Sequence, residues 1–202
     1  MPDTELAVSR SPSISAHRLL SNGCSSALVR PDGEIDWWCA PRFDSSPLLW
    51  KLLDPAGGCA RWRGVRMVQA SGPPAGPTVT TLLATDDGAR VELMDGIVGD
   101  EHAAVLVRLV RAELPVVLEH DLTLGGFDLP AVAWTDAGEG RAGDLLVRAE
   151  GGELTVEGDR LRSTVTASTR WTGIAVRVGA APGSIPSFAE LAEDLLERER
   201  QH

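Results

Sequence analysis

The side chains best suited to catalysis or binding lie in one short stretch of the chain. Asp36 and Asp44 are eight positions apart and stand beside two adjacent tryptophans. Inverting glycoside hydrolysis requires two carboxyl groups roughly 6.5–9.5 Å apart, with a water molecule between one of them and the sugar. A turn between the two aspartates could bring them together. In the alternative, Asp36 points outward from a strand and Asp44 caps a loop through backbone amides, which is the commoner use of a loop aspartate.

Aromatic and basic side chains in the same stretch could form a sugar platform. Trp37, Trp38, Arg42 and Phe43 would supply it, because tryptophan stacks on pyranose C–H groups and arginine donates to hydroxyls. Successive strand residues point to opposite faces, so Trp37 and Trp38 cannot both enter one core. The outer tryptophan is then covered by a neighbouring helix or meets a partner surface.

Other catalytic and cofactor motifs are missing from the sequence. The four histidines are scattered, and Asp100, Glu101 and His102 are consecutive on an expected turn, which favours a solvated charged loop over a metal site. There is no G-x-S-x-G elbow and no G-x-x-x-x-G-K-[ST] phosphate loop. We therefore assign no catalytic residue, no metal and no cofactor to these motifs.

Composition narrows the class of protein. The chain has 202 residues, 43% of them hydrophobic, and a formal net charge of -10, which disfavours nucleic acid as a partner. No apolar run reaches the ~18 residues of a membrane span, and the first residues do not resemble a secretory signal. The three cysteines, Cys24, Cys39 and Cys59, form no disulfide or metal-ligand pattern. We expect free thiols and a cytoplasmic protein.

The elements that must position these residues are mostly strands. Pro31, Asp32 and Gly33 form a turn between strands at 26–30 and 34–39, and a second hairpin turns at 86–88. Alternating apolar residues predict roughly ten to twelve strands and an all-β, large antiparallel β-sandwich. The expected strands cover 26–30, 34–39, 59–63, 78–84, 89–98, 103–112, 116–124, 131–134, 145–149, 153–157, 161–167 and 171–178.

Two helices complete the prediction. Ser46 as N-cap and Pro47 as first residue predict a short helix after the first hairpin, ending near Asp54. A capping box of Ser187 and Glu190 begins an amphipathic helix at the end of the chain. This helix packs on its own sheet or links to another unit. The predicted division is a disordered leader at 1–13, a sandwich at 14–180, and a linker with the helix at 181–202.

Several segments follow one another in an unusual order: LSNGCSSA at 20–27, LVRPDG at 28–33, IDW at 35–37, Cys39, PRFDS at 41–45 and the glycine-to-tryptophan segment at 57–62. In this order they resemble the N-terminal domain of glycoside hydrolase family 15, in its bacterial trehalase-like and glucoamylase-like branch. Weaker similarities lie at 91–95, at 106–108 and at Phe127 and Asp128. Around Phe127 the chain has GGFDL where the family often has an R-P-R-F-D-Y type segment.

The resemblance implies a β-sandwich that precedes a helical linker and an (α/α)6 barrel, and this barrel carries the two catalytic glutamates of an inverting α-glucosidase. Those glutamates have no counterparts here, so we expect a non-catalytic scaffold whose partner is the barrel, with an α-glucoside as the substrate of the parent enzyme. By analogy, the loop from Pro41 through Arg42, Phe43 and Asp44 to Ser45 would point toward the active-site mouth.

Two alternatives remain open at this stage. The chain could be a stand-alone module that binds carbohydrate or protein, or that self-associates, because the tryptophan hairpin and the last helix could leave an apolar patch exposed. It could also be an intact small hydrolase that uses Asp36 and Asp44.

Overall fold

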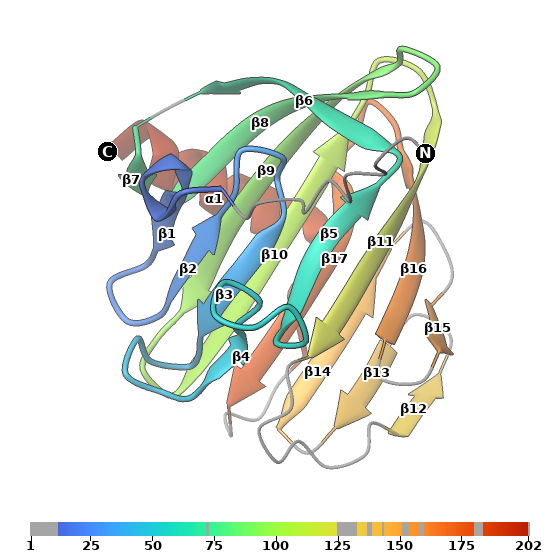
Figure 1. Cartoon of the computed structure of the whole chain (residues 1–202). Helices are drawn as coiled ribbons and strands as arrows, with labels where there is room; N and C mark the ends of the chain where they lie inside the picture. Colours follow the sequence, from blue (N-terminus) through green and yellow to red (C-terminus); the bar gives the residue numbers. More distant parts are fainter. Residues whose placement is uncertain are drawn as a thin grey trace, which may run out of the picture.

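A computed structural model describes residues 12–71, 73–124, 133–136, 139–142, 144–150, 154–157, 160–179 and 184–201. Within these residues seventeen strands form two sheets that pack face to face, with one α-helix behind them (Figure 1). The described strand pairs are antiparallel except for β1 with β7, which is parallel. The predicted all-β sandwich is confirmed, and the division of the chain into leader, sandwich and linker stays a prediction.

The nine-stranded sheet has the order β15-β16-β11-β5-β3-β2-β1-β7, and β4 pairs with β3 outside this path. Its strands are β1 (Arg18–Ser21), β2 (Ser26–Val29), β3 (Ile35–Cys39), β4 (Pro47–Leu49), β5 (Gly58–Arg63), β7 (Ala75–Gly76), β11 (Val116–Leu124), β15 (Leu154–Glu157) and β16 (Arg160–Ala167). A single 3-10 turn, η1 (Ile14–Ala16), precedes β1.

The eight-stranded sheet has the order β12-β13-β14-β17-β10-β9-β8-β6. Its strands are β6 (Val65–Ser71), β8 (Thr78–Thr85), β9 (Arg90–Gly99), β10 (Ala103–Arg111), β12 (Ala133–Asp136), β13 (Glu139–Ala142), β14 (Leu145–Ala149) and β17 (Thr172–Gly179). Both predicted hairpins are present, as β2 with β3 and β8 with β9. At the first turn Gly33 has a backbone φ of 79°, a conformation that residues other than glycine rarely adopt.

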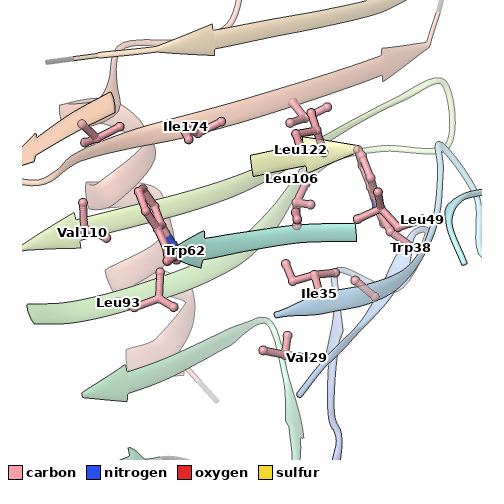
Figure 2. Packing of buried hydrophobic residues seen from close by; sticks show 14 of the residues in the cluster. Val29, Ile35, Trp38, Leu49, Trp62, Leu93, Leu106, Val110, Leu122 and Ile174 are labelled. Atoms are coloured by element: carbon pink, nitrogen blue, oxygen red, sulfur yellow. The ribbon is translucent and has the colours of Figure 1, made fainter. Parts of the chain in front are cut away.

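The space between the sheets holds the main hydrophobic core (Figure 2). One layer comes from the nine-stranded sheet and includes Val29, Ile35, Trp38, Leu49 and Leu122, and the other comes from the eight-stranded sheet and includes Leu93, Leu106, Val110 and Ile174. Each fully buried aliphatic side chain contributes about 1.5–3 kcal/mol relative to exposure. This core holds the two sheets together.

The C-terminal helix α1 (Phe188–Gln201) covers the other side of the eight-stranded sheet (Figure 1). The predicted capping box is present, because Ser187 Oγ accepts a hydrogen bond from the backbone of Glu190 and the Glu190 carboxylate accepts one from the backbone of Ser187. Phe188, Leu191 and Leu195 lie in a second buried cluster with residues of β9, β10, β14 and β17. The helix therefore packs on its own sheet.

The prediction of a short helix after the first hairpin is wrong. Pro47 does not begin a helix but starts β4, in which Leu49 pairs with Trp38 of β3, and a turn follows from Trp50 to Asp54. A helix confined between Pro47 and Asp54 would have fewer than two turns, which is too short to be stable alone. The free edge of β3 offers backbone hydrogen bonds and a buried site for Leu49 instead. Residues 1–11, Phe127, Asp128 and residues 181–183 of the linker lie outside the described residues.

Candidate functional site

Three loops meet at one end of the sandwich, and we call them the rim loops: residues 22–25, 41–46 and 99–102. The backbone N–H of Phe43 donates to the carbonyl oxygen of Cys24 at 2.6 Å, which ties the first two loops together. The side-chain amide of Asn22 donates to the carbonyl oxygen of Gly99 at 3.2 Å, which ties in the third. The loop that carries Pro41 and Asp44 is thus held by its neighbours, and its side chains face outward.

Arg42 and Asp44 form a two-pronged ion pair on this rim. Arg42 Nε donates to Asp44 Oδ1 at 2.8 Å and Nη2 donates to Oδ2 at 3.0 Å. The hydrogen bonds from Arg42 lower the pKa of Asp44, so this carboxyl group is ionised at neutral pH and unsuited to act as a general acid. Ser45, and not Asp44, accepts a hydrogen bond from the Arg42 backbone. Phe43 stands beside the pair and is 63% exposed.

The two tryptophans separate as the strand geometry predicts. Trp38 is fully buried in the main core, where its indole N–H donates to Ser25 Oγ at 3.1 Å. Trp37 is half-buried. The helix expected to cover the outer tryptophan does not form, and the buried ring of Trp38 presents no open face for a sugar. Among the predicted site residues, the structure brings only Arg42, Phe43 and Asp44 together at the surface.

Asp36 is not the solvent-facing strand residue that was expected. It is 1% exposed, and its Oδ2 lies 3.1 Å from Nε2 of His17. Burial raises the pKa of Asp36, while the hydrogen bond from His17 opposes this shift. A buried aspartate and an exposed, arginine-bound Asp44 do not form a pair of carboxyl groups that share a sugar and a water molecule.

The charged turn next to the rim is structural. Asp100 Oδ1 accepts hydrogen bonds from the backbone of His102 and of Ala103, at 2.8 and 3.1 Å. Glu101 and His102 are exposed, and Glu101 lies 3.8 Å from Arg42. Within the described part of the chain no group of three or more metal-ligating side chains converges. The described segment is thus an exposed, charged turn held by backbone hydrogen bonds to Asp100.

A buried charge network was not predicted. Arg108 and Asp95 are fully buried and paired across β10 and β9, with Arg108 Nε donating to Asp95 at 2.8 Å. Arg108 Nη1 also donates to the Ala60 carbonyl oxygen at 2.8 Å and lies 3.2 Å from Nε2 of His120, both on the opposite sheet, and Nη2 donates to the carbonyl oxygen of Gly33. The arginine therefore bridges the two sheets through their core.

The contacts within this network determine the protonation state of His120 and shift the pKa of Asp95. Arginine can only donate, so Nε2 of His120 accepts and the ring is neutral. Burial, and then the charge of Arg108, lower the pKa of His120 well below its ordinary value. Burial raises the pKa of Asp95, and Arg108 opposes this shift. One sequence pattern points to this network. Arg108 lies two positions from Leu106 and from Val110, so it faces the core as they do.

A second unpredicted group surrounds Asp121 on the outer face of the nine-stranded sheet. Arg61 and Arg162 approach this carboxylate to 3.3 Å, Arg63 to 3.8 Å and Arg160 to 4.0 Å. Glu119 and Asp121 alternate on one side of β11, and the arginines come from strands that are distant in sequence. We call these five residues the Asp121 cluster.

Comparison with protein families supports the sequence resemblance. The family described as trehalase-like, N-terminal, matches residues 4–75, a segment that contains β1 to β6 and the rim loop at 41–46. The resemblance to trehalase-like N-terminal domains is thereby confirmed over that part of the chain, while the weaker similarities at 91–95 and 106–108 lie outside it. No curated protein matches the chain. In the part that the structure describes, no helix is long and apolar enough to cross a membrane.

Proposed function

We propose that this chain serves as the N-terminal β-sandwich of a trehalase-like or glucoamylase-like glycoside hydrolase of family 15, and that it is not catalytic itself. In this proposal the parent reaction is inverting hydrolysis of an α-glucosidic bond, performed by an (α/α)6 barrel that the sandwich supports. The match to trehalase-like N-terminal domains over residues 4–75 carries the proposal. No redox cofactor or metal enters it.

The chemistry of the described carboxylates supports a non-catalytic role. An inverting enzyme needs one protonated carboxyl group and one carboxylate that both reach the sugar. Asp36 is buried against His17, and Asp44 is exposed but is held in the ionised state by Arg42. The arrangement suits a rim that contacts a neighbouring surface or a passing substrate.

The rim loop at 41–46 is our candidate for the part that shapes substrate access. Its exposed ring of Phe43 and its paired Arg42 and Asp44 offer an apolar face beside hydrogen-bonding groups, the combination that sugars and protein partners both use. Backbone contact with Cys24 holds the loop in place, so a partner would meet a preformed surface.

Hydrolysis and binding assays on the chain test this proposal. With trehalose, maltose or maltotriose we expect no glucose above the buffer control. We also expect no heat of binding in calorimetric titration with the same sugars. Measurable hydrolysis that Asp44→Asn abolishes would overturn the proposal in favour of a small hydrolase. Saturable heats without hydrolysis would favour the alternative of a carbohydrate-binding module.

The access role has its own test in a polypeptide that joins this chain to the helical barrel of a trehalase-like enzyme. Phe43→Ala combined with Arg42→Ala should lower kcat/KM for trehalose by about tenfold, since each 1.4 kcal/mol of lost transition-state binding is one factor of ten. Leu53→Ala, at a residue 71% exposed in the turn after β4, is the matched control and should leave kcat/KM unchanged. Equal values for the three proteins would remove the rim loop from the proposal.

A further inference from the structure

The outer face of the nine-stranded sheet gathers four arginines around one carboxylate. Asp121 is nearly buried, with 2% of its side chain exposed, because the arginine side chains lie over it. Arg61 and Arg162 hold it directly, at 3.3 Å each. Arg63 and Arg160 stand farther from it, at 3.8 and 4.0 Å. The carboxylate is therefore satisfied by the two inner arginines.

Strand register places the two outer arginines at opposite ends of the cluster. Arg61 on β5 and Arg162 on β16 both lie directly opposite Asp121 on β11. Arg63 lies opposite Glu119 and Arg160 opposite Thr123, two residues away in either direction. Figure 1 shows β5, β11 and β16 side by side. At roughly 3.3 Å per residue along a strand and roughly 4.8 Å between strands, the arginines form a diagonal row.

Among the described residues, the cluster has more guanidinium groups than carboxylates. Its four guanidinium groups pair with two carboxylates among the side chains that the structure describes, those of Asp121 and Glu119, in a chain whose net charge is -10. Arg63 and Arg160 have side chains 41% and 39% exposed, and neither guanidinium forms a hydrogen bond with the residues that the structure describes. The Nε of Arg160 is buried without a hydrogen-bond partner there. Both guanidinium groups therefore keep hydrogen-bonding capacity that no described residue uses.

We propose that the Asp121 cluster is a docking site for an extended, acidic segment of a partner protein, bound through Arg63 and Arg160. A guanidinium group matches a carboxylate with two parallel hydrogen bonds. In an extended segment, acidic residues at alternate positions project on one side at intervals of roughly 6.6–6.8 Å. Nε of Arg63 and Nη1 of Arg160 lie 3.8 and 4.0 Å from the same oxygen of Asp121, so the two guanidinium groups are close enough to bind two successive carboxylates of this kind.

Carboxylates fit this surface better than a nucleic acid does. Binding to a phosphate backbone depends on many neutralised phosphates and on a broad basic surface. Here the basic patch is small, it contains the carboxylates of Glu119 and Asp121, and the rest of the chain is acidic. Arg61 and Arg162 already show the geometry of carboxylate recognition at this place.

Fluorescence anisotropy with the full chain tests the proposal. The probe is a labelled eight-residue peptide of alternating glutamate and threonine, and the same peptide with glutamine for glutamate is the negative control. We expect binding that weakens as salt rises. The double variant Arg63→Gln with Arg160→Gln should bind at least about tenfold more weakly. It keeps Arg61 and Arg162 on Asp121, so its circular dichroism spectrum should match that of the unaltered chain.

A charge-matched variant makes the result specific. Arg66→Gln with Arg90→Gln removes two exposed arginines from β6 and β9 of the other sheet and should leave peptide affinity unchanged. Three results would overturn the proposal: no binding of the glutamate peptide, equal loss of affinity in both double variants, or displacement of the peptide by heparin or single-stranded DNA at lower concentration than by unlabelled peptide. None of these results depends on the glycosidase proposal.

Discussion

At the scale of single residues, the charge with the largest effect on stability is one that has no access to solvent. Arg108 is fully buried and its three nitrogen atoms contact Asp95, His120 and two backbone carbonyl groups. Removing one partner of a buried ion pair leaves the other charge without compensation in a medium of low polarity, which costs more than the pair itself contributes. The network is therefore a point at which one substitution can unfold the sandwich.

Arg108→Met should lower the free energy of unfolding by about 3–5 kcal/mol, because it leaves the buried carboxylate of Asp95 without its charged partner. Urea titration followed by tryptophan fluorescence measures this. Arg111→Met is the matched control on the same strand, where Arg111 pairs with Glu92 at 2.7 Å but is 44% exposed. The control should lose no more than about 1 kcal/mol. Equal losses in the two variants would show that the buried pair is not a special element of stability.

His120 gives the same network a pH dependence. The folded protein keeps this imidazole neutral well below its ordinary pKa, whereas the unfolded chain takes up a proton near pH 6.5. Acidification therefore favours the unfolded state, and the stability present above pH 6.5 declines as the pH falls toward the folded pKa. The slope contributed by this group should approach about 1.4 kcal/mol per pH unit.

Urea titrations of the unaltered chain and of His120→Gln at pH 7.5, 6.5 and 5.5 (values chosen to bracket the ordinary pKa of histidine) isolate this effect. The difference in unfolding free energy between the two proteins should shift in favour of the variant as the pH falls. His102→Gln, at a histidine whose side chain is 76% exposed, serves as the control and should follow the unaltered chain. Parallel profiles for all three proteins would contradict the assignment to His120.

At the scale of elements, helix α1 depends on a glycine in the sheet beneath it. A Cβ atom added to Gly96 of β9 would lie 2.3 Å from Leu195 Cδ2, so the absence of a side chain allows the helix to approach. Leu195 is fully buried in the cluster that joins α1 to the sheet. The two positions are coupled by direct contact.

Gly96→Ala should destabilise the protein by about 1–3 kcal/mol through overpacking, and Leu195→Ala by about 2–5 kcal/mol through the cavity it leaves. The double variant should lose less than the sum of the two, because the added methyl group occupies space that Leu195 vacates. Urea unfolding of the four proteins completes the cycle. Strictly additive losses would show that the helix does not rest on Gly96.

Most strands were predictable from their apolar residues and from the turn residues between them, but elements decided by distant partners were not. The hairpin of β8 and β9 and the long β11 follow from period two and turn residues. Residues 47–49 were misassigned because Pro47 and two leucines suit a helix equally well, and only the open edge of β3 decides between the two. β6 was missed because six of its seven residues are exposed and show no alternation.

The candidate site divides in the same way. Arg42, Phe43 and Asp44 were predicted as a surface group, since they lie within one loop and their pairing is local. The burial of Asp36 was not predictable, because it depends on His17, nineteen positions away. The Asp121 cluster joins three strands whose register no local pattern reveals. A charged residue at a core-facing strand position, as at Arg108, is the sequence signal that indicates a buried network.

At the scale of the whole molecule, the two outer faces of the sandwich differ in kind. The nine-stranded sheet shows the Asp121 cluster, whereas the eight-stranded sheet is covered by α1, whose exposed residues include Glu190, Glu193, Asp194 and Glu197. Under the helix lies an apolar surface that includes Met94, Val98, Val105, Val107 and Leu109. Without α1 the second face would therefore be an exposed apolar sheet, a surface that promotes association.

Deletion of residues 184–202 should convert the chain into a self-associating form that binds a hydrophobic dye, because it uncovers the apolar surface of β9, β10 and β17. Multi-angle light scattering and dye fluorescence measure these changes. Deletion of residues 197–202 is the matched control, since it removes polar residues and leaves Phe188, Leu191 and Leu195 in place. We expect this shorter deletion to keep the size and dye response of the full chain. If the longer deletion also did so, the helix would be an appendage of the sandwich and not the layer that completes it.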